Sequence, residues 1–291
     1  MLAELEFSAI TLERQEEYLA LLRATPQVTS DYSFVNLWSW AEEHGLEWAW
    51  ADGLVWIRQS RPALAYWAPV GPWSTIDWRM MMPRLTGAHL IRIPENLALR
   101  MVHNHPRARI RTMRHHWDYL YSLPELVALS GNRFHAKKNL LRQFHNTYLW
   151  RYHPLNEELI ECVLLMQDQW CAWRNCEESA ELAAEDRVIA KVLKAYSALP
   201  ALMGGVLLVD ARVVAFTVAE PLPAASLLIH FEKGMGSYKG VYQAMNREFL
   251  AAQQGFSLVN REQDLGDEGL RQAKLSYHPV GFLRKYELLW L

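Results

Sequence analysis

The 291-residue sequence has few cysteines and no long apolar run. Its three cysteines, Cys162, Cys171 and Cys176, form neither an even set nor a closely spaced metal pair, which excludes a disulfide framework. We therefore expect reduced thiols. The longest apolar stretch, 198–209, contains Pro200 and two glycines, so it is too short and too broken to cross a bilayer. The sequence predicts no integral membrane segment.

An excess of charge of one sign is also absent. The chain has 30 Lys and Arg residues against 32 Asp and Glu residues, a formal net charge of -2. This balance argues against a general nucleic-acid binder, although it allows a local basic patch. The first twelve residues carry Glu4 and Glu6 where a secretory signal would have a basic start and an apolar core. Together these absences predict a soluble, cytoplasmic protein.

Recognised metal and nucleophile motifs are missing as well. His103, His105, His115 and His116 lie close together in the sequence, but their spacing matches no standard zinc motif. No glycine-serine elbow supports an acyl-serine hydrolase. We therefore predict no metal site and no cofactor that the enzyme would hold permanently.

What the sequence does contain is alternating strand and helix patterns. Eight of the thirteen tryptophans lie between Trp38 and Trp78. Segments 47–50 and 54–57 are predicted strands, and Asp52-Gly53 between them is typical of a tight hairpin, because glycine accepts the positive φ of such a turn. The first half therefore mixes strands and helices.

The second half has a clearer order. Asn156 and Asp267 are expected to cap helices, because an Asn or Asp side chain accepts a main-chain N–H at a helix start. Apolar residues 159, 163, 166, 170 and 173 form one helical stripe. We predict helices near 131–148, 157–173, 184–197, 240–254 and 267–278, and strands near 150–153, 205–209, 212–219, 226–231, 256–260 and 282–290. This order predicts a mixed sheet covered by helices, with domains 1–129 and 130–291.

A glycine-rich stretch, 230–241, joins a predicted strand to a predicted helix. Its glycines permit a tight turn, and the N–H groups at the start of the helix favour a phosphate or carboxylate. The spacing matches neither a P-loop nor the dinucleotide fingerprint. A simple structural turn is the competing interpretation.

A second polar stretch, 260–279, begins where a predicted strand ends, and strand ends in such sheets often hold ligands. Glu262 or Asp264 could accept a proton, and Arg261 or Lys274 could hold a carboxylate or phosphate. The competing interpretation is a solvated loop with one helix cap and a salt bridge.

The predicted helix 131–148 has one basic side, which includes Lys137, Lys138 and Arg142. Such a side could bind RNA or another polyanion, or it could simply be solvated.

Three segments carry a family resemblance. They are Asp31 to Trp38, Phe231 to Lys233 with Gly240 to Asn246, and Asn260 to Gly266 continuing to His278-Pro279. Over essentially the whole chain, the sequence resembles the bacterial family related to the C-terminal domain of phosphatidylglycerol lysyltransferase. The resemblance implies an α+β fold of two tandem GNAT-like (acyl-CoA N-acyltransferase type) domains. Each would have a mixed, mainly antiparallel sheet flanked by helices, as in the Fem-type peptidyltransferases.

The resemblance also implies a transfer reaction, from aminoacyl-tRNA or acyl-CoA to an amine or hydroxyl of a small-molecule or peptide acceptor. In GNAT-type enzymes, the turn after the fourth strand holds the pantetheine pyrophosphate, and residues 236–240 occupy that place. A catalytically silent binding or scaffold protein is the alternative. The expected site residues are Glu262, Asp264 and Lys274 as catalytic, Glu232, Lys233, Tyr238, Asn246, Asn260, Arg261 and Tyr277 as substrate-binding, Gly236 and Gly240 as cofactor-binding, and Lys137, Lys138 and Arg142 as tRNA-binding.

Overall fold

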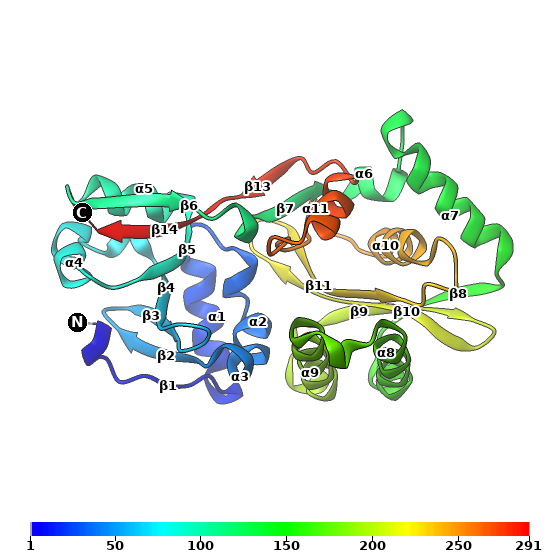
Figure 1. Ribbon diagram of the computed structural model, residues 1–291, viewed down its shortest axis with the longest axis horizontal. Coiled ribbons are helices and arrows are strands. Elements are labelled where there is room, and N and C mark those ends of the chain that lie inside the picture. The colour runs from blue at the N-terminus through cyan, green and yellow to red at the C-terminus, as the bar shows by residue number, and fades with distance from the viewer. Residues whose placement is uncertain (1, 291) are drawn as a thin grey trace. The chain divides into compact units, whose positions relative to one another are not determined.

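The structure is a computed structural model that describes residues 2–290. The described residues form two compact units (Figure 1). Unit 1 is built from the segments Met1–Asp118, Gln263–Arg271 and Phe282–Leu291, and unit 2 from Tyr119–Glu262 and Gln272–Gly281. Each unit contains most of one seven-stranded sheet.

The sheet of unit 1 has the strand order β1-β2-β3-β4-β5-β14-β6. Its neighbours are antiparallel except for β4 and β5, which run parallel. The strands are β1 (Ser8–Ala9), β2 (Leu46–Ala51), β3 (Leu54–Gln59), β4 (Ala65–Val70), β5 (Leu90–Pro94), β6 (Ala108–Thr112) and β14 (Lys285–Trp290). The predicted hairpin between β2 and β3 is confirmed, with φ of 55° at Asp52 and 72° at Gly53.

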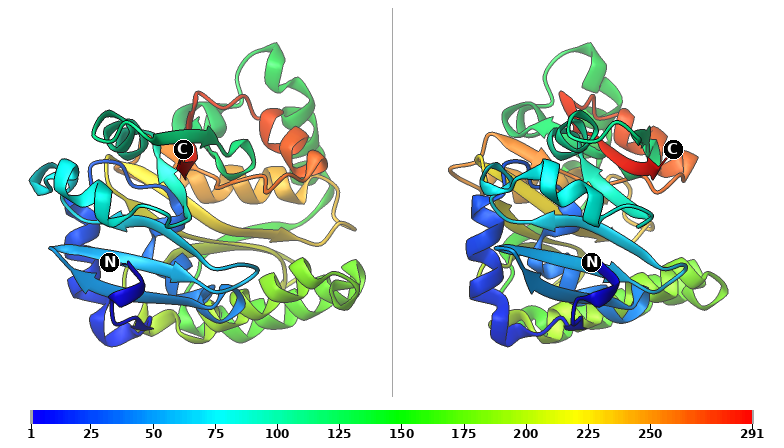
Figure 2. Two further views of the ribbon diagram at one scale, coloured as in Figure 1. Left: turned by 60° about the vertical axis from the view of Figure 1, so that its left-hand side comes forward. Right: turned by 90° about the vertical axis from the view of Figure 1, so that its left-hand side faces the viewer.

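The helices of unit 1 enclose a tryptophan-rich core. They are α1 (Gln15–Ala24), α2 (Phe34–Ser39), α3 (Ala41–His44), α4 (Trp78–Arg84) and α5 (Glu95–His103). Figures 1 and 2 show α1 beside β2 and β3. Trp48, Trp56 and Trp73 are buried, so the tryptophan cluster seen in the sequence is core rather than a binding surface.

The second sheet has the order β13-β7-β12-β11-β10-β9-β8. From β8 to β11 the neighbours are antiparallel, β11 and β12 are parallel, and β12 and β7 are antiparallel. The strands are β7 (Asp118–Ser122), β8 (Trp150–Pro154), β9 (Met203–Val209), β10 (Arg212–Leu222), β11 (Ser226–Gly234), β12 (Leu258–Asn260) and β13 (Gly281–Leu283).

The two sheets match strand for strand. In each, an antiparallel run of four strands is followed by one parallel pair, which is β4 and β5 in unit 1 and β11 and β12 in unit 2. A sixth strand then pairs antiparallel with the second member of that pair, β14 in one sheet and β7 in the other. The predicted α+β class with two tandem domains of one GNAT-like fold is confirmed.

Helices cover both faces of the unit 2 sheet. They are α6 (Leu123–Ala128), α7 (His135–Thr147), α8 (Ile160–Arg174), α9 (Ala180–Lys194) and α10 (Val241–Ala251), and α11 (Glu268–Leu275) spans residues of both units. Figures 1 and 2 show α8 and α9 on one face of β9–β11 and α10 on the other.

The predicted helix cap at Asn156 is confirmed, because Asn156 Oδ1 accepts the Leu159 N–H at 3.2 Å. Across residues 2–290, every helix is too short or too polar for a membrane crossing.

The sixth strand of each sheet comes from the other half of the sequence. β14 lies near the C-terminus yet pairs between β5 and β6, and β7 precedes residue 129 yet pairs with β12. A cut at residue 129 would therefore take one strand from each sheet. The continuous domains 1–129 and 130–291 stay a prediction.

The expectation of three reduced thiols is wrong for two of them. Cys171 and Cys176 form a disulfide, and Cys162 is free and exposed. The reason is local: α8 ends at Asn175, whose left-handed φ of 52° turns the chain so that Cys176 returns beside the last turn of the helix. A five-residue spacing alone does not reveal this reversal.

A buried ion cluster joins distant segments of unit 1. Lys285 of β14 is fully buried and forms ion pairs with Asp31 and with Asp118, whose Oδ1 lies 2.6 Å from Nζ. Ser30 adds two hydrogen bonds to Asp118, each 2.7 Å. Arg92 also pairs with Asp31. The motif Asp31 to Trp38 therefore supplies a structural anchor within unit 1.

Replacing Lys285 should test this anchor. In Lys285→Met, Asp31 and Asp118 would remain buried without the ammonium, so the free energy of unfolding should fall by about 3–5 kcal/mol. Ten of the thirteen tryptophans lie in unit 1 (eight between 38 and 78, with Trp117 and Trp290), so tryptophan fluorescence in urea reports on it. Lys194→Met removes an exposed lysine and serves as the control. Equal stability of the two variants would contradict the anchoring role.

Candidate functional site

The candidate site lies in unit 2, where β11 and β12 separate. The parallel ladder runs only from Ser226–Leu258 to Leu228–Asn260, and β11 then continues to Gly234 paired with β10 alone. Because the strands are parallel, their C-terminal ends lie at the same end of the sheet. Beyond the last residue pair of this ladder, side chains of the two segments that point to the same face of the sheet therefore lie close together.

A buried ion pair fills the space beyond this ladder. Arg261 donates to Glu232 at 2.9 Å, and Asn246 of α10 donates to the other carboxylate oxygen at 3.2 Å. The Arg261 guanidinium lies 5.1 Å from the ring of Tyr277, whose hydroxyl accepts from Gln243 at 3.3 Å. Burial lowers the pKa of Arg261, but the Glu232 carboxylate, together with Tyr277 and Tyr121, outweighs burial and raises it. Four predicted substrate-binding residues are thus brought together.

The equivalent segment of unit 1 is apolar. After β4, the chain forms a turn that buries Trp73 and leads to the buried Trp78. Their indole N–H groups donate to the carbonyls of Pro69 and Trp73, at 2.8 and 2.9 Å. A packed indole core offers no convergent polar groups, so the comparison of the two sheets favours unit 2 for chemistry.

Two other predicted substrate residues lie apart from the Glu232–Arg261 pair. Lys233 comes directly after Glu232 in β11 and therefore points to the other face of the sheet. There its ammonium pairs with Glu185 at 2.6 Å and lies 4.2 Å from the ring of Trp170. Tyr238 packs against Tyr148, with ring centroids 5.1 Å apart.

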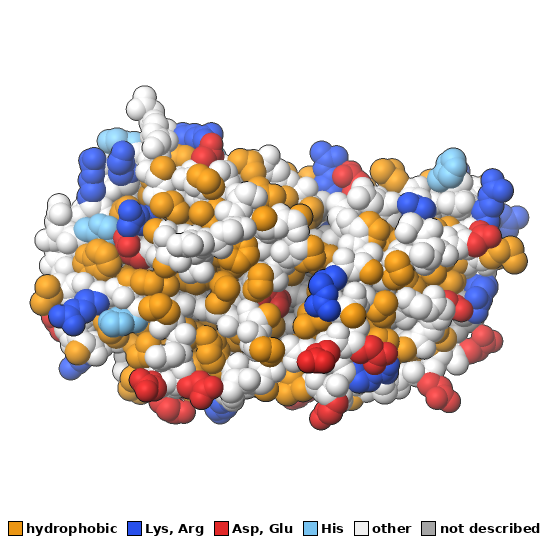
Figure 3. All heavy atoms as spheres, turned by 180° about the vertical axis from the view of Figure 1, so that it is seen from behind, with side chains coloured by type: hydrophobic (Ala, Val, Ile, Leu, Met, Phe, Trp, Pro, Cys, Tyr) orange, Lys and Arg blue, Asp and Glu red, His pale blue; other side chains and the backbone are white. Residues whose placement is uncertain are grey.

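The three basic residues predicted on one face of α7 have different surroundings. Lys137 lies 4.3 Å from the ring of Tyr277, and its pKa is lowered by burial and by the nearby Arg261 charge. Lys137 therefore belongs to the Arg261–Tyr277 cluster, while Arg142 is exposed and Lys138 half-buried. Figure 3 shows basic side chains gathered at its upper left, where α7 lies.

A histidine that the sequence analysis missed, His230, contacts Glu262, one of the two predicted proton acceptors. His230 is the extra residue of a β-bulge in β11, because Val218 pairs with Phe231 and Ala219 with Ile229. Its Nδ1 lies 3.2 Å from Glu262, and its Nε2 lies 3.1 Å from Glu220. Burial lowers the pKa of His230, but the two carboxylates outweigh it and raise the pKa to about 9. His230 is therefore a cation at neutral pH and donates to both carboxylates.

The backbone at Glu262 is left-handed, with a φ of 54°, which is uncommon for a residue other than glycine. Asn260 stabilises this conformation, since its Oδ1 accepts the Glu262 N–H at 2.8 Å. Asn260 is buried, so its position is that of a turn-forming residue. The Glu262 side chain is one-quarter exposed.

The other two predicted catalytic residues are held by contacts within their units, Asp264 buried and Lys274 half-buried. Asp264 is fully buried in unit 1, where Arg271 donates to both carboxylate oxygens at 2.9 and 3.0 Å and Arg114 donates at 3.1 Å. Lys274 of unit 2 donates to the main-chain carbonyl of Arg261 at 2.6 Å. Two guanidinium groups around one buried carboxylate favour anchoring over proton transfer.

In the turn after β11, two glycines lie close to other atoms of the protein. A Cβ at Gly236 would lie 2.6 Å from the indole of Trp173, which is half exposed although the sequence placed it on a core stripe. The N–H groups of Tyr238, Lys239 and Val241 donate to Met235 O, Tyr148 Oη and Tyr238 O. These three N–H groups are therefore not presented to a pyrophosphate, and Gly236 and Gly240 stay predictions as cofactor-binding residues.

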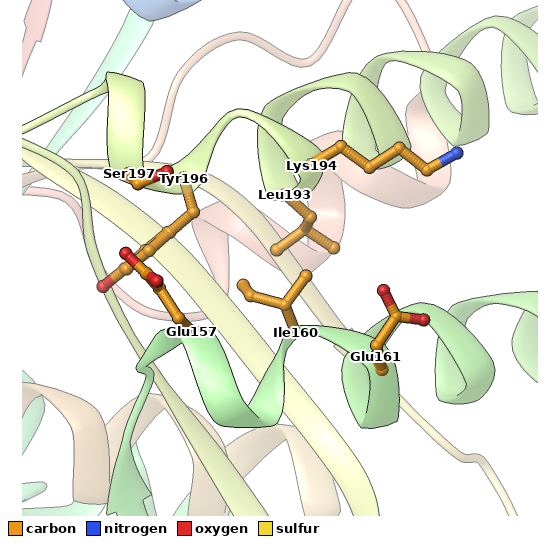
Figure 4. Close-up of a pocket in the computed structure, with 7 residues that line it drawn as sticks. All are labelled: Glu157, Ile160, Glu161, Leu193, Lys194, Tyr196 and Ser197. Atoms are coloured by element: carbon orange, nitrogen blue, oxygen red, sulfur yellow. The ribbon is translucent and has the colours of Figure 1, made fainter.

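A separate pocket lies between the start of α8 and the end of α9 (Figure 4). It is lined by Glu157, Ile160, Glu161, Leu193, Lys194, Tyr196 and Ser197. None of these is a predicted site residue, and the pocket therefore adds nothing to the cluster around Glu232. Among residues 2–290, His, Cys, Asp and Glu side chains form no metal-binding group of three.

Comparison with known proteins decides the family. The model of the family described as phosphatidylglycerol lysyltransferase, C-terminal, matches residues 22–288. The chain belongs to the phosphatidylglycerol lysyltransferase C-terminal family. No curated protein sequence matches at a significant level.

Solved structures share the fold of this chain. A conserved protein of unknown function from Bacteroides thetaiotaomicron is 31% identical, with a TM-score of 0.90 over 99% of this chain and 100% of that one. L-PGS from Bacillus licheniformis shares 14% identity at a TM-score of 0.64, over 94% of this chain and 91% of that one. FemX shares 8% sequence identity with this chain at a TM-score of 0.58, over 97% of this chain and 96% of that one. The last two likenesses concern the fold.

Glycine substitutions should test the close packing of the turn after β11. In Gly240→Ala, the new Cβ would meet the Leu140 carbonyl oxygen at 2.1 Å in addition to a φ of 86°. Gly255→Ala is a matched control, with a φ of 82° and no atom within 4 Å. The control should cost roughly 1–2 kcal/mol of unfolding free energy and Gly240→Ala clearly more. Equal losses in urea titrations would contradict the close packing.

The pH dependence of stability should reveal the His230 cation. Its folded pKa of about 9 exceeds the unfolded value of about 6.5, so the folded state keeps the proton between these values while the unfolded state loses it. The stability that His230 contributes is complete below about pH 6.5 and is lost as pH rises through 9, at up to about 1.4 kcal/mol per pH unit. His230→Gln should lack this slope in urea unfolding, and His153→Gln, an exposed control, should keep it.

Proposed function

We propose that this chain transfers an aminoacyl group from aminoacyl-tRNA to an amine or hydroxyl of a small-molecule or peptide acceptor. The observation that carries the proposal is the lysyltransferase family match over residues 22–288. The polar cluster at the separated strands of unit 2 supports a site there. The turn after β11 favours aminoacyl-tRNA over acyl-CoA as donor, because its Tyr238, Lys239 and Val241 N–H groups donate within the protein and are not presented to a pyrophosphate.

The chemistry needs no nucleophile from the enzyme. The acceptor's lone pair attacks the carbonyl carbon of the aminoacyl ester, and a new amide or ester bond forms. The bond between that carbon and the ribose oxygen breaks, and the ribose oxygen takes up the proton that the acceptor loses. The protein's task is to hold the two substrates together and to relay this proton.

Glu262 is our proposed proton carrier. Its side chain is partly exposed, at the end of β12, and His230 holds one of its oxygens at 3.2 Å. His230 is itself a cation at neutral pH, so it positions Glu262 and does not accept the proton. Asp264, the other predicted carboxylate, is enclosed by Arg114 and Arg271, and we propose that it anchors the loop.

The ion pair of Glu232 with Arg261 is our proposed substrate contact. The pair has no net charge, and Asn246 and Tyr277 complete its polar surroundings. Lys137, beside Tyr277, adds one positive charge that suits a phosphate or carboxylate of a substrate. Lys233 and Tyr238 stay predictions as substrate contacts.

A transfer screen tests the proposal directly. Purified chain is mixed with labelled aminoacyl-tRNAs, or with acyl-CoAs, and a pool of amine and hydroxyl acceptors, and products are identified by mass spectrometry. We expect transfer from aminoacyl-tRNA. Glu262→Gln should lower kcat by on the order of a hundredfold, because the proton carrier is lost. Its melting temperature should change little, since the side chain is partly exposed.

Glu177→Gln, which changes an exposed glutamate in the short 3-10 helix Cys176–Glu178, is the matched control and should keep full turnover. A folded chain that transfers nothing from any donor would favour a scaffold protein. Full turnover in Glu262→Gln would remove Glu262 from the proton path.

A further inference from the structure

The segment from α5 to β6 in unit 1 is strongly basic. Between Glu95 and Asp118 the sequence has five arginines and four histidines but no acidic residue. The whole chain, in contrast, has a formal net charge of -2. Positive charge is therefore concentrated in this segment, as it also is between Glu125 and Glu157, where five Lys and Arg residues occur without an acidic one. The sequence analysis considered the segment between Glu95 and Asp118 only for metal binding.

Three of these arginines, which we call the arginine strip, lie in α5, in the turn after it and in β6. Arg100 lies in the last turn of α5, Arg107 in the turn after this helix, and Arg109 in β6. All three are exposed. His105 Nδ1 accepts the Arg107 N–H at 3.3 Å and holds the turn. β6 is the last strand in its sheet order, next to β14.

The arginine strip lacks neutralising partners within residues 2–290. Arg100, Arg107 and Arg109 form no ion pair with Asp or Glu there, and the Arg109 guanidinium donates to the carbonyls of Pro106 and Ala108. Neighbouring arginines differ: Arg111 pairs with Glu287, and Arg114 pairs with Asp264. The strip therefore retains three positive charges.

The chemistry of the strip suits phosphodiesters. Guanidinium groups donate two parallel hydrogen bonds to a phosphate, and they keep their charge at any physiological pH. Arg107 precedes β6 and Arg109 lies within it, with the buried Ala108 between them, so the two exposed guanidinium groups can each contact a different phosphate. A row of separate anions fits this arrangement better than one small anion does.

Among the described residues of α5, Leu99 is the only large apolar side chain that is exposed. Leu99 is 58% exposed, but its neighbours in α5, Ala98 and Met101, are fully buried. A single exposed leucine is ordinary on a protein surface. The side chains beside the strip therefore favour a polyanion over a lipid layer.

We propose that the arginine strip binds the phosphodiester backbone of an RNA. The inference rests on the proposed function in one respect, since an aminoacyl-tRNA donor would supply that RNA. It places an RNA contact in unit 1, in addition to α7 of unit 2.

Binding of full-length chain to labelled, uncharged tRNA tests the strip without any need for transfer. The variant is Arg100→Gln with Arg107→Gln and Arg109→Gln. The control, with the same change in charge, is Arg23→Gln with Arg79→Gln and Arg212→Gln, three other exposed arginines. Fluorescence anisotropy is measured from low to moderate salt, and melting temperatures verify folding. Single variants Arg107→Gln and Arg109→Gln provide the same test if the triple variant folds poorly.

The strip variant should bind tRNA at least tenfold more weakly than the control, and the slope of log K against log salt should decrease by about 2 to 3, because three phosphate contacts are lost. Equal affinity and equal slope in the two variants would overturn the proposal. So would unchanged tRNA binding combined with lost binding to phosphatidylserine–phosphatidylcholine vesicles. Strip-dependent tRNA binding in a chain that transfers nothing would support the strip while contradicting the proposed function.

Discussion

The ion cluster around Lys285 is the interaction on which unit 1 depends. A lysine and two aspartates lose their hydration on burial, and only their mutual pairing compensates for that loss. Lys285 is therefore held where Asp31 and Asp118 meet, although these residues lie 254 and 167 positions away in the chain. The pairing requires β14 to insert between β5 and β6. The C-terminal strand thus completes a sheet that the N-terminal segments begin.

The motif 260–266 serves two purposes through two carboxylates with different surroundings. Gln263 and Asp264 belong to unit 1, where Gln263 donates to Asp31 at 2.8 Å and Asp264 is enclosed by arginines. Glu262 belongs to unit 2, where it meets the His230 imidazolium and remains partly exposed. A carboxylate that two guanidinium groups enclose has little capacity to accept a proton. The same segment therefore combines an anchor with the proposed proton carrier.

The two matching sheets differ in the side chains that lie beyond their parallel pairs. In unit 1, buried indoles occupy the segment after β4, whereas unit 2 places Glu232, Arg261 and Asn246 beyond the end of its ladder. The turn after β11 is closed by Trp173 and by the carbonyl of Leu140. The same sheet architecture therefore has a packed apolar segment beyond its parallel pair in unit 1 and a polar one in unit 2. Side chains rather than topology decide what such a segment can bind.

Features that depend on neighbouring residues were determined by the sequence itself. The Asp52-Gly53 hairpin and the Asn156 and Asp267 caps are correct, because the partner groups lie within a few residues. The cluster of Glu232, Asn246, Arg261 and Tyr277 was also anticipated, through the two motifs. Only the tertiary structure decided that His230 holds Glu262, that Arg114 and Arg271 enclose Asp264, and that Trp173 covers Gly236. Most of those partners lie tens of residues away, and even near ones depend on bulges and on burial that no spacing in the sequence encodes.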